Sequence, residues 1–163
     1  MRDDELNELY VKRLAATVRH IQSVQQNAIL LAERIIEKDS SKRELARQLV
    51  ANSLQHDQSK LEGIEWDYLL CNDEDKLVMA INQHNRTNFH HPEHWGGIES
   101  MPDIFLAEMA CDWKSRSSEL GTDFKKWVKE DAPKKYNYPI SGGVYKKIKF
   151  FADLLLGEGF KNL

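Results

Sequence analysis

Apolar residues recur every three or four positions near the start of the chain, and this spacing constrains the fold most strongly. They form a stripe along one side of a helix, made of Leu14, Val18, Ile21, Val24, Ala28, Leu31 and Ile35. The spacing predicts a helix over residues 3–38, either continuous or broken near Arg19. No stretch shows sustained alternation of apolar and polar residues, so we expect almost no sheet. The predicted fold class is all-α.

The same periodicity and the positions of turn residues predict further helices along the chain. They cover residues 41–56, 64–70, 75–85, 102–120, 122–130 and 141–156. Ser41 and Glu44 have the spacing of a capping box at the start of the second helix, and Thr122 is expected to cap the helix that it begins. The stretches 85–97 and 132–140 contain prolines and are predicted to be irregular.

Length and charge exclude some classes of protein. The 163 residues suffice for one domain with a substantial core, and we expect a single domain over residues 1–163. A net charge of −3 predicts no duplex nucleic-acid partner. No run approaches the roughly 20 apolar residues of a membrane span, and the acidic N-terminus lacks the apolar segment of a signal peptide. We therefore expect a cytoplasmic protein, which could form homo-oligomers, with Cys71 and Cys111 as reduced core thiols.

The adjacent residues His56 and Asp57 place an imidazole beside a carboxylate at the end of a predicted helix. His56 lies on the same helical face as Leu49, so it should point into the core. His20 lies beside the apolar stripe of the first helix, and Asp112 lies on the buried face of a later one. Such ligands suit Mn, Fe, Co, Ni or Zn, and Mg could occupy a second site. The predicted ligands of the first metal are His20, His56, Asp57 and Asp112.

A histidine-rich stretch downstream supplies further candidates. His84 should point inward from its helix, either as a core histidine or as a ligand. His90 and His91 are adjacent, so in extended backbone they would face opposite ways, and we expect at least one to be a ligand. With His84 they could complete a second metal site or contact a substrate phosphate. His94 is expected to pack on Trp95 or to contact substrate.

Other polar residues near these ligands are candidates for binding and catalysis. Lys60 could bind a phosphate or remain solvated at a helix end. Glu108 could orient a histidine, act as a general base, or pair with a cation, and Arg116 could pair with Asp112 or with substrate. The predicted catalytic residues are Asp57, Lys60 and Glu108, and the predicted substrate contacts are Lys60, His84, Asn88, His94 and Arg116.

These residues carry a resemblance to a known family. The order of His20, His56-Asp57 and Asp112 resembles the HD-domain superfamily of metal-dependent phosphohydrolases. Residues 56–60 and the pair at 90–91 look like motifs of its cyclic-dinucleotide branch, whose Gly-Tyr-Pro motif is absent here. The chain is more similar to a small uncharacterised HD-like family of bacteria and phages. The shared motifs are His56–Lys60, Ala80–His84, Asn88–Trp95 and Glu108–Trp113.

The resemblance covers about residues 15–130, and residues 131–163 would be a helical extension. It implies a compact HD-type helical bundle around a central site with one or two divalent metals. It also implies hydrolysis of a phosphoester, with a nucleotide as the expected substrate and a metal-activated water as the nucleophile. Two alternatives stay open: a di-iron oxygenase on the same scaffold, and a non-catalytic protein that binds or sequesters a nucleotide.

Overall fold

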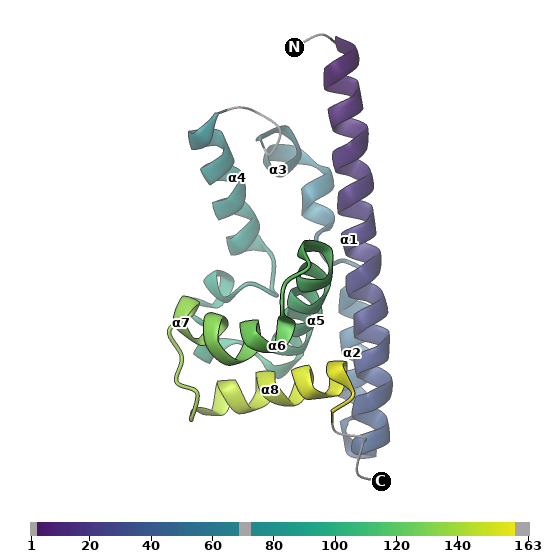
Figure 1. Cartoon of the computed structure of the whole chain (residues 1–163), viewed down its shortest axis with the longest axis vertical. Coiled ribbons are helices and arrows are strands. Elements are labelled where there is room, and N and C mark those ends of the chain that lie inside the picture. The colour runs from purple at the N-terminus through teal and green to yellow at the C-terminus, as the bar shows by residue number, and fades with distance from the viewer. Residues whose placement is uncertain (1–2, 69–72, 159–163) are drawn as a thin grey trace.

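The computed structural model describes the backbone of residues 3–68 and 73–158, and within these ranges it contains helices and no strand (Figure 1). The α-helices are α1 (Asp3–Lys38), α2 (Arg43–Ser53), α3 (Gly63–Tyr68), α4 (Glu74–Thr87), α5 (Asp103–Leu120), α6 (Phe124–Lys126), α7 (Ala132–Lys135) and α8 (Gly143–Leu156). Shorter turns of helix are η1 (Ser40–Lys42), η2 (Gln58–Leu61), η3 (Pro92–Trp95), η4 (Ile98–Ser100) and the π-helical η5 (Trp127–Asp131). The all-α prediction is confirmed.

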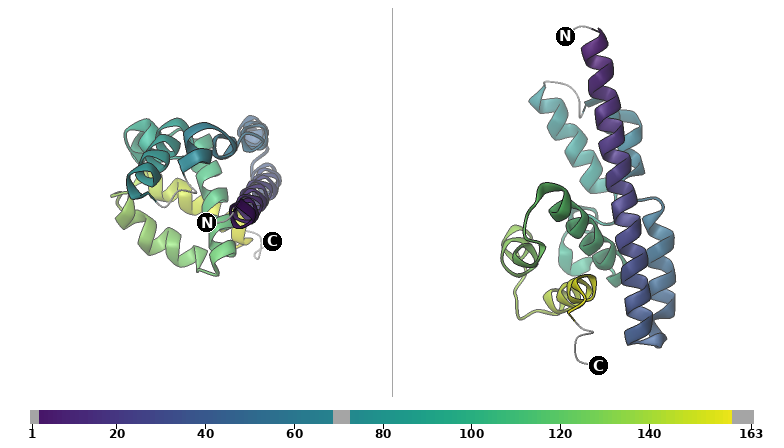
Figure 2. Two further views of the ribbon diagram at one scale, coloured as in Figure 1. Left: turned by 90° about the horizontal axis from the view of Figure 1, so that it is seen from above. Right: turned by 45° about the vertical axis from the view of Figure 1, so that its right-hand side comes forward.

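Helix α1 runs along one side of the whole molecule (Figures 1 and 2). Its 36 residues form one helix about 54 Å long, without a break at Arg19. Helices α2, α5 and α8 pack against its C-terminal half, while α3 and α4 pack on each other beside its N-terminal half. The middle of α1 therefore borders both groups of helices.

The core explains why only part of the apolar stripe on α1 is buried. Val24, Leu31 and Ile35 have no exposed surface, and they meet core residues of α2, α5 and α8. Leu14 is 44% exposed and Val18 is 37% exposed, so the predicted burial of the stripe is wrong for its first half. The reason is that the three core helices reach only the second half of α1.

The structure corrects two predicted helix caps. Asp39, with extended backbone, accepts a hydrogen bond from the backbone N–H of Ser41, so the acid rather than Ser41 caps this helical segment. Glu44 bonds to the arginine one turn later instead of closing a capping box. Likewise Asp123, not Thr122, caps α6. A short 3-10 turn precedes α2, so the chain enters the helical segment earlier than the Ser41 pattern predicts.

Two other predicted boundaries are wrong. Helix α2 ends at Ser53 rather than at residue 56, so His56 lies in the following turn. The stretch 132–140 is not wholly irregular, because helical structure continues from α6 through η5 into α7. Pro133 allows this because it lies in the first turn of α7, where a missing N–H costs no helical hydrogen bond.

Some predictions fall on residues outside the described ranges. Cys71 and the last two residues of the helix predicted over 64–70 are among them. Cys111 is buried as a free thiol, as predicted. Among the described residues, no helix combines the length and apolar character needed to cross a membrane.

Candidate metal centre

Asp57 lies in the tight turn between α2 and η2, and its backbone has the left-handed conformation with φ 57° and ψ 13°. Aspartate tolerates this conformation better than most residues, but it remains uncommon outside glycine. The turn directs the carboxylate into the interior, where Asp57 is 1% exposed. Backbone strain of this kind is concentrated at functional sites.

Four histidines surround this carboxylate and aim the same ring nitrogen at it. Nε2 of His20 and Nε2 of His56 lie 3.4 and 3.7 Å from Oδ2 of Asp57. Nε2 of His84 and Nε2 of His90 lie 3.2 and 3.4 Å from the other oxygen, Oδ1. The two oxygens of one buried carboxylate therefore face two different pairs of imidazoles.

Three groups of side chains around Asp57 have the spacing to hold a metal ion. In each group, one ligand atom per residue lies within 4.8 Å of the others. The first group is His20, His56 and Asp112, the second is Asp57, His84, His90 and His91, and a third group, which overlaps the first two, is His56, His90 and Glu108. All seven metal ligands predicted from the sequence thus lie in one cluster.

The rings of His90 and His91 do not lie on opposite sides of the chain. Their centroids are 4.3 Å apart, and both side chains reach the cluster. The backbone turns here instead of running extended, with the N–H of His91 donating to the carbonyl of Asn88 at 3.1 Å. The extended arrangement that would separate the two rings is therefore not adopted, because the chain turns here, and both histidines stay candidate ligands.

Glutamates lie behind three of the histidines, on the side away from Asp57. Nδ1 of His20 donates to Glu119 at 2.7 Å, Nδ1 of His56 donates to Glu108 at 3.0 Å, and Nδ1 of His84 donates to Glu65 at 2.7 Å. A carboxylate on one ring nitrogen orients the imidazole and leaves the other nitrogen free to bind a metal. Metal-ligating histidines in proteins almost always have such a partner.

Three buried atoms at the centre of the cluster have no hydrogen-bond partner among the residues that the structure describes. They are Nε2 of His56, Nε2 of His90 and Oδ1 of Asp57. A buried polar atom without a partner costs about 1–3 kcal/mol, so three of them at one point indicate a missing ligand. Imidazole nitrogens and carboxylate oxygens bind divalent transition metals, and these residues therefore fit a metal ion.

The pKa values of two histidines in the cluster are shifted in opposite directions. Burial lowers the pKa of His20, but hydrogen bonds with Asp112 and Asp57 outweigh burial and raise that pKa to about 10. Burial, together with the neighbouring histidines, lowers the pKa of His91 to about 3. His91 is therefore neutral near pH 7 and available as a ligand, whereas His20 must lose a proton before Nε2 can bind a metal.

Lys60 and Asn88 also lie at this cluster. Nζ of Lys60 is 2.5 Å from Oδ2 of Asp57, and its side chain remains 28% exposed. The amide of Asn88 donates to Ser59 at 3.0 Å and to the backbone carbonyl of His84 at 2.9 Å. Lys60 is thus placed between the buried cluster and solvent, whereas Asn88 supports the turn that carries the histidines.

Arg116 and His94 lie farther from the centre. Arg116 pairs with Glu119 at 2.9 Å, and no ion pair joins it to Asp112 within the described ranges. His94 donates from Nδ1 to the carbonyl of Arg86, and its ring packs against Trp95 as predicted. His94 belongs to none of the three ligand groups.

The sequence reasoning missed Glu65 and Glu119. Glu119 follows Asp112 by seven residues on α5, and this two-turn spacing could have revealed it. Glu65 is 3% exposed on the short helix α3, where no periodic pattern identifies a buried acid.

Three cavities adjoin the cluster, and the smallest of them, of about 220 Å³, is lined by His56, His90 and Glu108. The two larger ones lie at different positions. The first, which we call the C-terminal cavity, has a volume of about 650 Å³ and reaches from the cluster into the space between α5 and residues 122–136. The second, of about 430 Å³, adjoins His20 and is lined by Lys60. Arg116 lines both of these larger cavities. The centre is therefore accessible to a small molecule from two sides.

The fold and the cluster define an all-α protein with a buried histidine and carboxylate centre able to hold a metal ion. The chain matches a family of unknown function, DUF5662, over residues 10–153, and it belongs to this family. The matched range contains all seven candidate ligands and continues through α7 into α8. No curated protein and no solved structure matches the chain at a significant level.

Proposed function

We propose that this protein is an HD-type metal-dependent phosphohydrolase that acts on a phosphoester, with a nucleotide as the expected substrate. The observation that carries the proposal is the arrangement of the imidazoles: three of them donate from Nδ1 to a buried or half-buried glutamate and direct Nε2 toward Asp57 or Asp112. The order of ligands along the chain, which resembles the HD-domain superfamily, supports it. The proposal includes a single HD-like domain and a cytoplasmic location, in keeping with the free thiol of Cys111.

The residues favour a centre with two divalent ions. His20, His56 and Asp112 would hold one ion, and His84, His90 and His91 would hold the other. Asp57 would contribute one oxygen to each, because its two oxygens face the two groups separately. The nitrogen-rich ligand set favours Mn, Fe, Co, Ni or Zn, with Mg a weaker fit for the second site. A bound divalent metal lowers the pKa of water toward neutrality and polarises a phosphoryl oxygen.

The cationic residues of the chain supply the charge that a phosphoester requires. Lys60 and Arg116 line the same cavity beside His20, and we assign them to the phosphoryl oxygens. Glu108 contacts Nδ1 of His56, which supports a positioning role rather than that of a general base. Its carboxylate would hold the His56 ring in the tautomer that binds metal.

Metal analysis combined with a substrate screen tests the proposal. We expect purified protein to bind stoichiometric transition metal and to release phosphate or a mononucleotide from a panel of nucleoside mono-, di- and triphosphates and cyclic dinucleotides. His56→Asn should remove most of the metal and the activity. His94→Gln, which changes an imidazole outside all three ligand groups, is the matched control for metal content. The proposal is contradicted if purified protein carries no stoichiometric metal and His56→Asn changes neither the metal content nor the turnover.

The same assay separates the two alternative functions. A di-iron oxygenase requires oxygen, so turnover that continues under anaerobic conditions excludes it. A sequestering protein would bind a nucleotide tightly and release no product. The complete ligand set counts against a degenerate, non-catalytic site.

A further inference from the structure

The wall of the C-terminal cavity opposite the metal ligands is aromatic. Trp113 on α5, Trp127 at the start of η5 and Tyr136 after α7 all line the cavity. The rings of Trp113 and Trp127 meet edge to face at 5.6 Å, and Trp113 stacks on Tyr136 at 5.7 Å with an angle of 13° between their planes. His90, His91 and Asp112 line the same cavity. One space therefore joins an aromatic wall to the candidate metal centre.

Trp127 presents a hydrogen-bond donor that nothing in the described chain accepts. Its Nε1 is buried and has no partner. Trp127 also begins the π-helical segment η5, and such π turns occur often at functional sites. A buried indole normally donates its N–H to a hydrogen-bond acceptor. The unpaired N–H of Trp127 therefore indicates a ligand whose planar ring carries a hydrogen-bond acceptor.

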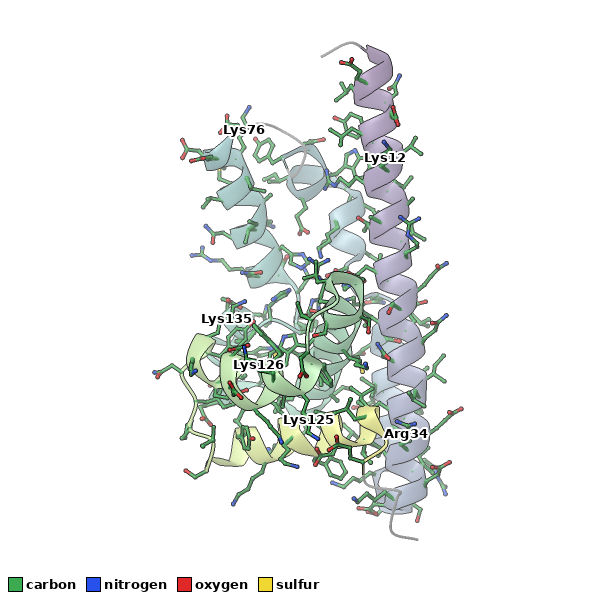
Figure 3. All side chains as sticks on the ribbon, in the orientation of Figure 1. Lys12, Arg34, Lys76, Lys125, Lys126 and Lys135 are labelled. Atoms are coloured by element: carbon green, nitrogen blue, oxygen red, sulfur yellow. The ribbon has the colours of Figure 1, made fainter. Side chains whose placement is uncertain are left out.

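Three basic side chains, Arg116, Lys126 and Lys135, line the cavity beside three acids, Asp112, Asp123 and Asp131, so cations are available there to an anionic ligand. Lys126 and Lys135 line the cavity from the α6–α7 side (Figure 3), and neither forms an ion pair within the part of the chain that the structure describes. Nζ of Lys135 lies 5.0 Å from the ring centre of Tyr136 and 5.6 Å from that of Trp127, so a cation borders the aromatic wall. Asp123, the nearest acid in sequence to Lys126, is engaged as the cap of α6.

We propose that the C-terminal cavity binds the base of a nucleoside monophosphate, whose phosphate group faces the metal centre. This inference rests on the proposed phosphohydrolase function and specifies its substrate. The base would lie among Trp113, Trp127 and Tyr136 and accept a hydrogen bond from Nε1 of Trp127. A volume of about 650 Å³ lies within the usual range for small-molecule sites. Residues 131–136, beyond the HD-like motifs, thereby acquire a role in substrate recognition.

A comparison of substrates with and without a base tests the inference. The probes are the four common nucleoside 5′-monophosphates and ribose 5-phosphate, assayed with metal-loaded protein by phosphate release and by calorimetric titration. At least one nucleotide should have a kcat/KM about tenfold or more above that of ribose 5-phosphate, because a stacked base adds binding that the sugar lacks. Equal values for all five probes would overturn the inference.

Trp127→Phe isolates the unpartnered donor, since it keeps an aromatic ring and removes the N–H. The ratio of kcat/KM for the preferred nucleotide to that for ribose 5-phosphate should fall about five- to tenfold, the usual effect of one hydrogen bond. Trp66→Phe is the matched control, because Trp66 packs on Tyr10 of α1 away from this cavity, and it should leave the ratio unchanged. An unchanged ratio in Trp127→Phe would contradict the proposed contact.

The outcomes separate this inference from the proposed function. Phosphate release without preference for a base keeps the phosphohydrolase and overturns the cavity assignment. If no probe releases phosphate, the proposed reaction is wrong, and the titrations alone decide the cavity: nucleotide binding that Trp127→Phe weakens supports it, and no binding overturns it. A measurement on the wild-type chain covers the case in which Trp127→Phe does not fold. Nucleotides should quench tryptophan fluorescence beside Trp113 and Trp127, whereas ribose 5-phosphate should not.

Discussion

Nδ1 of His56 donates a hydrogen bond to Oε1 of Glu108 over 3.0 Å, and both side chains are buried. The contact joins the turn after α2 to α5, across 52 residues of sequence. It assigns the ring proton to Nδ1, so the unpaired Nε2 faces Asp57 and Asp112. The orientation of the His56 ring therefore depends on Glu108, which contacts the ring nitrogen that points away from Asp57.

Glu108→Gln tests this dependence. The amide keeps the shape of the side chain but loses its charge and can present N–H₂ to the ring, so we expect metal affinity to fall about 10–100-fold. Competition with a chromogenic chelator measures the affinity. Glu99→Gln, which changes an exposed glutamate, should have no effect. Wild-type affinity in Glu108→Gln would show that the carboxylate does not tune His56.

Asp57→Asn tests the carboxylate that faces the first and second ligand groups. Asparagine also tolerates the left-handed backbone at this position, so helical content should be kept while the charge is lost. We expect metal affinity to fall about a hundredfold or more, with circular dichroism unchanged. Asp57→Ala adds a backbone penalty of about 1–2 kcal/mol and should also unfold at a lower temperature. Full metal content in Asp57→Asn would exclude a bridging role for Asp57.

The raised pKa of His20 predicts that metal binding releases a proton. With a pKa of about 10 in the metal-free protein, the His20 ring is protonated at neutral pH, and a metal can bind Nε2 only after that proton leaves. Affinity should therefore increase as pH rises toward that pKa. Calorimetry at about pH 7.5 in two buffers with different ionisation enthalpies measures the protons released. Heats that do not depend on the buffer would contradict the assignment.

The burial pattern of α1 predicts unequal effects for two leucines on the same helix. Leu31 has no exposed surface, so Leu31→Ala should lower the free energy of unfolding by about 2–5 kcal/mol. Leu14 is 44% exposed, and Leu14→Ala should change it by less than about 0.5 kcal/mol. Urea denaturation followed by circular dichroism measures both. A large loss at Leu14 would mean that the first half of α1 is covered, for example by a second copy of the chain.

Helical periodicity allowed the sequence to predict the helices and most of the cluster. His20 and Asp112 could be assigned to buried faces because a spacing of three or four residues fixes the direction of a helical side chain. Sequence order alone could not show that their side chains meet at 3.1 Å. The contact depends on how α1 and α5 pack, which the apolar pattern of each helix does not specify.

Features outside regular helices were not predictable in the same way. The turn that brings His91 beside His90 depends on local backbone torsions rather than on a repeating pattern. Glu65 lies on a helix of six residues, too short to show a buried face. The aromatic wall joins Trp113 to Trp127 across the end of α5, and these residues meet only because the chain reverses at Gly121.

The short contact between Lys60 and Asp57 leads to a final prediction. Nζ of Lys60 lies 2.5 Å from Oδ2 of Asp57 and lines the cavity beside His20, so the ammonium could either balance the buried carboxylate or bind a phosphoryl oxygen. Lys60→Met keeps the aliphatic stem and removes the charge. If Lys60 binds phosphate, kcat/KM for phosphate release should fall about 10–100-fold, while metal content stays stoichiometric because Asp57 loses only a competing cation.

Lys60→Arg, assayed by the same release measurement, should recover part of the activity. Loss of metal together with activity in Lys60→Met would instead assign the lysine to the support of Asp57, and wild-type turnover would remove it from the site.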